Sequence, residues 1–234
     1  MTLEAYLEKK QTQTEPAYRG FCCQCRLARA TCDCARLQPF SPATEFVILM
    51  HPEESRRRIA TGRLTHLILR NSHLIVAESF EYDARVTALL AADNRECVVL
   101  YPGKTALDIK DAEASRSELV SKKIRTIFVL DGTWRTAKKM LRLSPALAAL
   151  PQICFTPPHL STFRIRKQPR PYCYSTLEAV HHILSKFEPS LTERDQLIHL
   201  FDSMVERQIR YAAEADQKYN APTTPPQVKT ERLS

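Results

Sequence analysis

RTIFVLDGTWRTAKKMLRLS, residues 125–144, joins an apolar run to a helical pattern and decides the fold class. The run IFVL at 127–130 is typical of a buried strand, because four consecutive apolar residues leave neither face of a strand for water. Beyond Gly132, two kinds of side chain recur on opposite helical faces: Met140, Leu143 and Leu147 on one, Arg135, Lys138, Lys139 and Arg142 on the other. The stretch therefore predicts a strand, a short turn and an amphipathic helix.

The same alternation of apolar and helical segments continues on both sides of this stretch. Further strands are expected at 45–51, 73–79, 96–103 and, as a short one, 151–157. Helices are expected at 55–71, 83–92, about 111–123, 176–187 and 191–215. Strands that alternate with helices in this way form mainly parallel sheets that helices cover. We therefore predict an α/β fold with a mainly parallel sheet flanked by helices.

Length and composition indicate one main domain with appendages. The 234 residues, 44% of them apolar, are enough for a single packed core. We expect a flexible N-terminal tail (1–18), a cysteine-rich segment (19–44), a main α/β domain (45–214) and a disordered C-terminal tail (215–234). The C-terminal tail is rich in Pro and Thr and shows no apolar periodicity.

Composition also excludes several classes of protein. No apolar run approaches the roughly 18 to 20 residues of a membrane span, and the polar start MTLEAYLEKKQTQTEP lacks the apolar core of a signal peptide. We therefore expect a cytoplasmic protein. The chain has only four glycines, and their positions exclude both a G-x-G-x-x-G dinucleotide loop and a Walker P-loop.

The distribution of charge indicates an anionic partner. The formal net charge is +8, and the bases cluster in three segments, 54–63, 135–142 and 163–170. A nucleic acid is the simplest partner for such clusters, whereas the alternative is a set of solvated faces on an ordinary enzyme. The candidate RNA ligands are Arg58, Arg63, Arg135, Lys138, Lys139, Arg164, Arg166 and Lys167.

Cysteines in the segment FCCQCRLARATCDCARL have the spacing of a metal site. Cys22-x2-Cys25 and Cys32-x-Cys34 offer four thiolates from a short loop, the tetrahedral donor set that structural zinc prefers. An iron–sulfur cluster, redox chemistry or no metal at all are the alternatives. Cys23 is left over, since its pairing with Cys25 has a spacing less suited to clamping a metal ion.

Polar and small residues follow three apolar runs at the expected carboxyl ends of strands, where open parallel sheets bind ligands. They are Tyr101-Pro102-Gly103, the segment from Asp131 to Trp134, and Ser175, Thr176 and Glu178 at the start of a helix. Glycine at such turns permits positive φ and close approach of a ligand. The alternative is plain helix capping, by Asp131 or Thr133 for one helix and by Ser175 or Thr176 for the next.

Five ordered motifs resemble the DTW-domain family, and in particular its bacterial tRNA-uridine aminocarboxypropyltransferases. These motifs are the Cys22 to Cys34 cluster, HPEESRRRIATGRL at 51–64, LYPG at 100–103, DGTW at 131–134 and STLEA at 175–179. The resemblance runs from about Cys22 to Glu178 and extends into the closing helices. It rests on the order of all five motifs, which is far more specific than any one of them.

The resemblance implies a SPOUT-like fold with a C-terminal trefoil knot, whose loops hold S-adenosylmethionine. Carried over to this chain, the cofactor-binding residues are Leu100, Tyr101, Pro102, Gly103, Asp131, Gly132, Thr133, Trp134, Ser175, Thr176 and Glu178. The implied reaction transfers the 3-amino-3-carboxypropyl group to N3 of a uridine in the tRNA variable loop and releases methylthioadenosine. Whether such an enzyme is a monomer or a homodimer stays open.

Asp131 is the candidate catalytic residue. N3 of uridine is a weak nucleophile until its proton leaves, and a carboxylate at the cofactor loop is a suitable general base. Asp131 has two alternative roles, as a helix cap or as a ligand of the cofactor's amino group. Trp134 is interpreted as the core anchor of its helix, with stacking on adenine or on the uridine as the alternative.

Three rival functions fit parts of the same pattern. A SPOUT-type RNA methyltransferase would use the same fold and cofactor but present the methyl group. A non-catalytic, zinc-stabilised RNA-binding protein would explain the cysteines and bases but would give Asp131 no function. An aminocarboxypropyltransferase acting on ribosomal RNA would differ only in its substrate.

Overall fold

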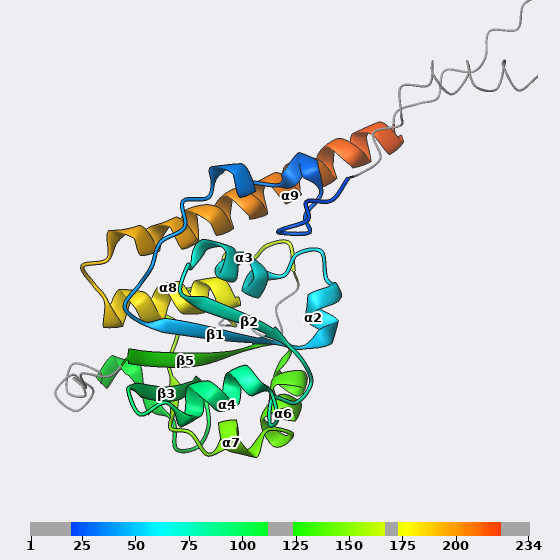
Figure 1. Ribbon diagram of the computed structural model, residues 1–234. Helices are drawn as coiled ribbons and strands as arrows, with labels where there is room; N and C mark the ends of the chain where they lie inside the picture. The colour runs from blue at the N-terminus through cyan, green and yellow to red at the C-terminus, as the bar shows by residue number, and fades with distance from the viewer. Residues whose placement is uncertain (1–19, 112–123, 167–172, 221–234) are drawn as a thin grey trace, which may run out of the picture.

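A six-stranded parallel sheet forms the centre of the molecule (Figure 1). The computed structural model describes residues 20–111, 124–166 and 173–220. Every strand pair is parallel, in the order β2-β1-β5-β3-β6-β4. The strands are β1 (Glu45–Met50), β2 (Ser72–Val76), β3 (Arg95–Leu100), β4 (Leu107–Asp108), β5 (Ile124–Asp131) and β6 (Gln152–Cys154). The predicted α/β class with a parallel sheet is confirmed.

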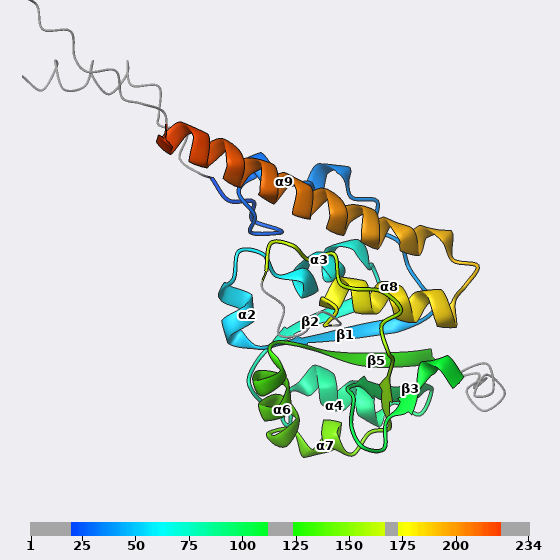
Figure 2. The ribbon, with the colours of Figure 1, turned by 180° about the vertical axis from the view of Figure 1, so that it is seen from behind.

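Helices cover both faces of the sheet (Figures 1 and 2). One layer contains α3 (Thr61–Ile68) and α8 (Thr176–Phe187), with the long α9 (Asp195–Asn220) packed outside them. The opposite layer contains α4 (Ala84–Ala91), α6 (Trp134–Arg142) and α7 (Pro145–Ala148). Short 3-10 helices lie at Arg29–Thr31, Cys34–Arg36, Ile109–Asp111 and Thr192–Arg194.

Two apolar cores lie on the two faces, and the strands supply them alternately. On β5, Ile127 and Val129 belong to the core under α8 and α9, whereas Phe128 belongs to the core under α4 and α6. On β1, Phe46 faces the first core and Val47 the second. This is the two-residue period of a strand buried on both sides, and it explains why the apolar runs are continuous.

The strand register brings three strand ends to one edge of the sheet. Met50 of β1 pairs with Asp131 of β5, and Leu100 of β3 pairs with Val129. The short helix α2 (Pro52–Arg56) and the N-termini of α6 and α8 begin at this carboxyl edge. The sequence motifs that follow β1, β3 and β5 are therefore neighbours in space.

One predicted helix is wrong. The expected helix at 55–71 is two helices, α2 and α3, because Arg57 and Ala60 between them have extended backbone conformations. This break lets α2 lie along the sheet edge while Leu64 and Ile68 of α3 enter the core.

Smaller differences concern boundaries. The last helix, expected at 191–215, begins at Asp195 after a 3-10 turn and continues to Asn220. The edge strand β4 and the short α7 were not expected, since two and four residues carry no periodic signal. The helix expected at about 111–123 and both expected tails lie mainly outside the described residues. Within the described ranges, every helix is too short or too polar to span a lipid bilayer.

The cysteine-rich segment packs against α9. Ser203 Oγ donates to Asp33 Oδ2 over 2.7 Å, and the Arg207 guanidinium lies 3.1 Å from Asp33 Oδ1. The next residue along α9, Gln208, donates from its Nε2 to Thr31 Oγ1 over 2.8 Å. The segment is therefore tied to the outer helix layer, beside the main domain.

Candidate active site at the carboxyl edge of the sheet

Asp131 ends β5 with its side chain buried at the edge of the sheet. Its backbone oxygen accepts from the His51 N–H over 2.9 Å, and its Oδ1 accepts from Thr176 Oγ1 over 2.5 Å. Its Oδ2 is buried and has no hydrogen-bond partner among the described residues. A carboxylate oxygen in this state is available to a ligand that brings a proton.

Helix capping does not explain Asp131. The N-cap of α6 is Thr133, whose Oγ1 accepts from the Thr136 N–H over 3.2 Å. The alternative in which Asp131 caps this helix is therefore wrong, and its carboxylate is left for another role.

Burial raises the pKa of Asp131 to about 6, since the ionised form loses its hydration. The Thr176 hydrogen bond opposes this shift, the nearby Glu54 charge adds to it, and the charges of Arg166 and Arg63 oppose it. A carboxylate with a pKa near 6 is ionised at neutral pH and still basic enough to accept a proton in a reaction.

Gly62 on α3 makes room for this carboxylate. A Cβ at Gly62 would lie 2.5 Å from Asp131 Oδ2 and 2.8 Å from its Cγ, closer than real Cβ atoms come. Gly132 similarly faces Thr136 Oγ1, 2.5 Å from the position of an added Cβ. No described glycine has a positive φ, so close packing, and not a left-handed backbone, is what requires glycine at positions 62 and 132.

Trp134 lies at the surface of this edge, with 51% of its area exposed. Its ring centroid is 6.3 Å from that of Tyr101, and its Nε1–H donates to Cys173 Sγ over 3.4 Å. The interpretation of Trp134 as a core anchor is wrong, because Ala137, Met140 and Leu141 fill the core from the next turns of α6. Tyr101 and Trp134 together present an aromatic surface beside Asp131.

The LYPG loop follows β3 next to β6. Tyr101 N–H donates to Ile153 O over 2.9 Å, which extends the pairing beyond Leu100, and Gly103 N–H donates to Tyr101 O over 2.8 Å. Pro102 is exposed, whereas Leu100 and Gly103 are half-buried. A Cβ at Gly103 would meet only the movable end of the Gln152 side chain.

Ser175 and Glu178 form the capping box of α8. Glu178 N–H donates to Ser175 Oγ over 3.3 Å, and Ser175 N–H donates to Glu178 Oε2 over 2.8 Å. The buried Glu178 carboxylate also accepts from Ser161 Oγ at 2.9 Å and from Thr162 N–H at 3.0 Å. It anchors the loop before α8, so the chain itself occupies both oxygens that were expected to face a cofactor.

Residues of the motif at 51–64 also contact the chain that precedes α8. His51 caps α2, with its Nδ1 accepting from the Glu53 N–H over 3.2 Å. Buried Glu54 accepts from both terminal nitrogens of Arg166 at 2.7 and 3.0 Å, a bidentate pair. No pattern in the sequence predicts a role for His51, Glu54 or Gly62. The Pro at the first helical position and the neighbouring acids were the available signals.

The predicted RNA ligands fall into separate groups. Arg58, Arg135, Lys138 and Arg164 are exposed. Lys139 forms an ion pair with Glu78 at 2.5 Å, and Arg166 is held by Glu54. Lys167 lies outside the described residues.

Arg63 requires a correction. It is buried, and its guanidinium donates to the backbone oxygens of Ser55 at 2.7 Å and Cys25 at 3.4 Å. A side chain enclosed in this way does not reach a phosphate, so the prediction of an RNA contact at Arg63 is wrong. Its position joins the cysteine-rich segment to α2.

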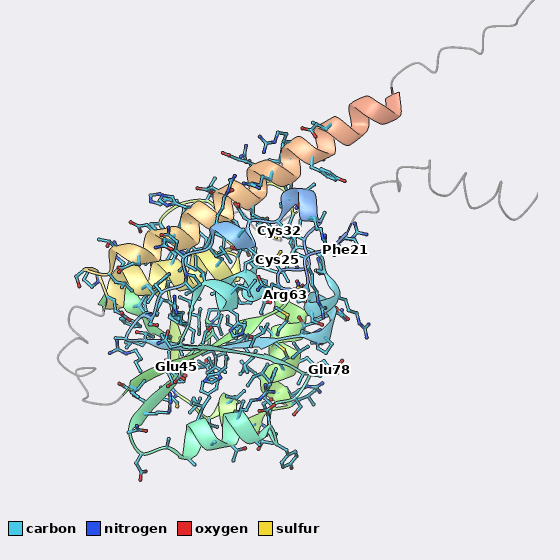
Figure 3. The ribbon with its side chains drawn as sticks, turned by 45° about the horizontal axis from the view of Figure 1, so that its top comes forward. Phe21, Cys25, Cys32, Glu45, Arg63 and Glu78 are labelled. Atoms are coloured by element: carbon cyan, nitrogen blue, oxygen red, sulfur yellow. The ribbon has the colours of Figure 1, made fainter. Side chains whose placement is uncertain are left out.

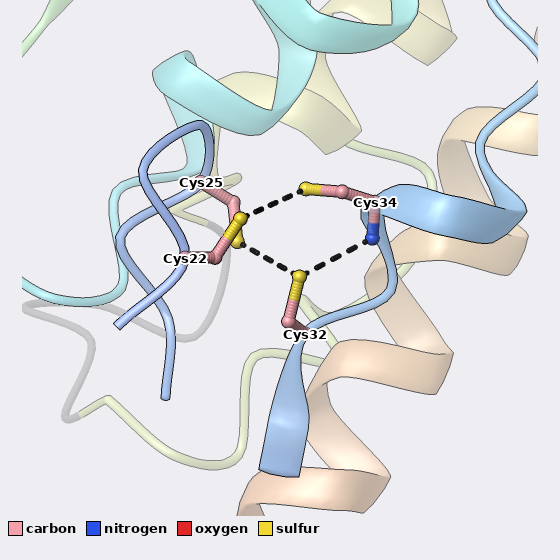
Figure 4. A group of neighbouring side chains, drawn as sticks. All are labelled: Cys22, Cys25, Cys32 and Cys34. Carbon is pink, nitrogen blue, oxygen red and sulfur yellow. Dashed lines mark hydrogen bonds between the residues drawn. The ribbon is translucent and has the colours of Figure 1, made fainter. Parts of the chain in front are cut away.

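The four predicted metal ligands meet at one point (Figure 4). The sulfurs of Cys22, Cys25, Cys32 and Cys34 all lie within 4.8 Å of one another. Cys22 to Cys34 measures 3.8 Å and Cys25 to Cys32 measures 3.6 Å. A tetrahedral ion with metal–sulfur bonds of about 2.3 Å sets its sulfurs about 3.8 Å apart. The donor set therefore fits a tetrahedral metal ion.

The thiols differ in environment. The Cys25 backbone N–H lowers the pKa of Cys22 to about 6, whereas burial raises the pKa of Cys25 to about 11. A divalent cation would supply the charge that stabilises several thiolates together. Cys23 is exposed and does not belong to the group, as its spacing predicted.

Comparison with known proteins identifies the family. The family model described as "DTW domain" matches residues 19–209. The chain is 27% identical to tRNA-uridine aminocarboxypropyltransferase 2 of Drosophila melanogaster, with 83% of this chain and 77% of that protein covered. It is 28% identical to tRNA-uridine aminocarboxypropyltransferase A of Arabidopsis thaliana, with 82% of each covered. The mouse tRNA-uridine aminocarboxypropyltransferase 2 is 25% identical, with 84% of this chain and 66% of that protein covered.

The family match includes both the four-cysteine cluster and the sheet edge that carries Asp131 and Trp134. It spans most of the 234 residues. This chain belongs to the DTW domain family.

Proposed function

We propose that this protein is a tRNA-uridine aminocarboxypropyltransferase. It transfers the 3-amino-3-carboxypropyl group of S-adenosylmethionine to N3 of a uridine in the tRNA variable loop, in the cytoplasm. The family and the names of the relatives support the reaction class. The observation that carries the proposal is the buried Asp131, with a pKa of about 6 and one oxygen that no described group occupies.

The sulfonium of S-adenosylmethionine supplies an electrophilic carbon, whose bond to sulfur breaks as the bond to N3 forms, releasing methylthioadenosine. Asp131 accepts the N3 proton on Oδ2, while Thr176 holds Oδ1. Gly62 leaves the space that this orientation requires. The net change is one proton moved from uridine to the carboxylate and one alkyl group moved from sulfur to nitrogen.

Three loops meet at the carboxyl edge and are the proposed binding site of S-adenosylmethionine: 100–103, 131–134 and 175–178. The side chains of Thr133, Ser175 and Glu178 already serve as caps, so these residues would contribute through their backbone and their shape. The exposed Trp134 ring, with the half-buried Tyr101 ring beside it, is suited to stack on adenine or on the extruded uracil.

A SPOUT-like trefoil knot of the C-terminal part belongs to the same proposal. Two features support it: the three loops share one edge of a parallel sheet, and β6 lies beside β3 although β5 intervenes in the sequence. Zinc is the proposed metal of the four cysteines. Four cysteines close its coordination and leave no position for water, which makes its role structural.

Exposed bases near the site are proposed to position the tRNA. Arg135 and Lys138 lie in the first half of α6, which follows the Asp131 loop, and Arg164 lies on the loop before α8. Such side chains contact phosphates and orient the substrate without reading its sequence. The target is an unpaired uridine, because N3 is occupied in a base pair.

Nucleoside mass spectrometry of tRNA from cells with and without the gene tests this function. We expect aminocarboxypropyl-uridine to disappear with the gene and to return with the wild-type protein but not with Asp131→Asn. An unchanged tRNA nucleoside profile would contradict the proposal. Loss of the nucleoside from ribosomal RNA instead would identify ribosomal RNA as the substrate.

Labelled S-adenosylmethionine separates the rival reactions in vitro. Label in the carboxyl group should enter tRNA, and label in the methyl group should remain in methylthioadenosine. Methyl label in tRNA would indicate a methyltransferase. Tight tRNA binding without either label would indicate a binding protein.

A further inference from the structure

The first described residues form a tight antiparallel hairpin, residues 20–29, which we name the knuckle. Phe21 pairs with Ala28, Cys22 N–H donates to Leu27 O over 2.8 Å, and Arg29 N–H donates to Gly20 O over 2.7 Å. Arg26 at its tip has φ 62, the left-handed conformation that a sharp turn requires. Phe21, Arg26 and Arg29 are exposed as a result, and 46% of the Phe21 surface faces solvent.

Side-chain contacts join the knuckle to α2 and the residues that follow it. Figure 3 shows Phe21 and Cys25 of the knuckle on the same side of the molecule as Arg63 of α3. Arg26 Nη1 donates to Ser55 O over 3.0 Å, and Arg63 bridges Ser55 O and Cys25 O from inside. On the outside, the Arg58 guanidinium lies 4.8 Å from the centroid of the Phe21 ring. The two segments therefore form one continuous surface.

This knuckle–α2 surface is basic. It contains Phe21, Arg26, Arg29, Arg56, Arg57 and Arg58. The acids of α2 are the exposed Glu53 and the buried Glu54, and Glu54 is already paired with Arg57 and Arg166. Arg26, Arg29, Arg56 and Arg58 have no carboxylate partner within the described ranges, so their charges face solvent.

The surface adjoins the candidate active site. His51, which caps α2, donates its backbone N–H to Asp131 O. The five residues of α2 then span about 7.5 Å at 1.5 Å per residue. A polyanion with one of its monomer units bound at Asp131 can therefore extend along α2 to the knuckle.

We propose that the knuckle–α2 surface binds the RNA substrate next to the modified uridine, with an unpaired base on Phe21 and phosphates on the surrounding arginines. This inference rests on the proposed function, since it names where the same substrate continues. An exposed aromatic ring beside guanidinium groups favours RNA over an acidic polypeptide, because unpaired bases stack on both kinds of plane. Phosphates supply the complementary charge.

Equilibrium binding of tRNA over a range of salt concentrations tests the inference. Phe21→Ala should weaken binding about tenfold, as loss of one stacked base does, and Phe21→Tyr should preserve it. Arg58→Ala and Arg26→Gly should each lower the slope of log Kd against log salt by about one. Glycine is chosen at position 26 because it tolerates the positive φ.

Arg85→Ala is the matched control, since it removes the same charge from α4 in the opposite layer, where Arg85 pairs with Asp83. It should change neither the Kd nor the slope. Metal content and Tm of each variant show whether the knuckle has kept its structure. In turnover with tRNA, we expect the Phe21 effect in KM more than in kcat.

Unchanged affinity and salt slope in the folded Phe21 and Arg58 variants would overturn the inference. Competition by polyglutamate as strong as by RNA, with no effect of Phe21→Ala, would overturn it in favour of an acidic polypeptide. The proposed function fails separately, if the wild-type protein binds tRNA through this surface but transfers no aminocarboxypropyl group.

Discussion

Thr176 Oγ1 donates a hydrogen bond of 2.5 Å to Asp131 Oδ1 and thereby joins two residues 45 positions apart. Thr176 is the first residue of α8, and Asp131 is the last residue of β5. The bond fixes which carboxylate oxygen is occupied and leaves Oδ2 for the substrate. The orientation of the proposed base is therefore set by a helix that follows it in the sequence.

Thr176→Val should move the pH dependence of transfer to higher pH. The hydroxyl stabilises the ionised carboxylate and lowers the pKa of Asp131, so its loss raises that pKa above about 6. A general base acts when deprotonated, so kcat/KM should rise through the pKa and level off above it. Profiles of kcat/KM against pH for the wild type, Thr176→Val and Thr176→Ser provide the measurement. The Ser variant should retain the wild-type profile, and a Val profile displaced to lower pH would refute the assignment.

Asp131→Asn should stabilise the fold at neutral pH. Because burial raises the pKa of Asp131 from 3.8 to about 6, the folded protein binds the proton more tightly than the unfolded chain. The stability that this group contributes is present below pH 4 and is lost as pH rises to about 6. The ionised carboxylate then costs roughly 2–3 kcal/mol, which Asn avoids.

Urea unfolding at pH 4 and at pH 8 tests this linkage. At pH 8 the free energy of unfolding of Asp131→Asn should be higher than that of the wild type. At pH 4 the difference between the two free energies should be smaller. An equal difference in the free energy of unfolding at both pH values would mean that ionisation of Asp131 does not affect stability.

Gly62→Ala should abolish most activity. The added Cβ would lie 2.5 Å from Asp131 Oδ2, so the carboxylate must move, and displacement of a catalytic group by about 1 Å costs on the order of 100-fold in rate. Ala88→Gly is the comparison, since it also changes one methyl group but at an exposed position of α4, in the opposite helix layer. Single-turnover rates of the two variants distinguish them, and equal rates would show that space at Gly62 is unimportant.

Cys25→Ser should release the metal and destabilise the protein. Cys25 is the buried member of the group, and loss of one of four ligands removes binding energy that also contributes to folding. Metal content and thermal unfolding provide the measurements. Cys23→Ser, at the exposed cysteine outside the group, should change neither. One bound metal retained by Cys25→Ser with an unchanged Tm would contradict the four-cysteine site.

The sequence was sufficient where periodicity or spacing carries the signal. Helix α8 was predicted with its observed bounds, since Ser175 and Glu178 form a capping box that three-residue spacing reveals. The four cysteines were identified from spacing alone, and the structure brings their sulfurs together.

Features that depend on tertiary packing were beyond the sequence. Trp134 is apolar and was expected in the core, but Ala137, Met140 and Leu141 occupy that space, so the indole remains at the surface. Arg63 lies in a basic cluster, and only the fold shows that its donors are used by Ser55 and Cys25. The close approach of Gly62 to Asp131 joins residues from different motifs, which no local pattern reports.

The contacts of Asp33 with Ser203 and Arg207 have a consequence for synthesis on the ribosome. They join residues about 170 positions apart, so the cysteine-rich segment leaves the exit tunnel long before its docking helix exists. Its four thiols can capture a metal ion at that stage, because all lie within 13 consecutive residues, from Cys22 to Cys34. We expect an early metal-bound hairpin that attaches to the domain only when α9 has emerged, which makes docking of this segment a late step of folding.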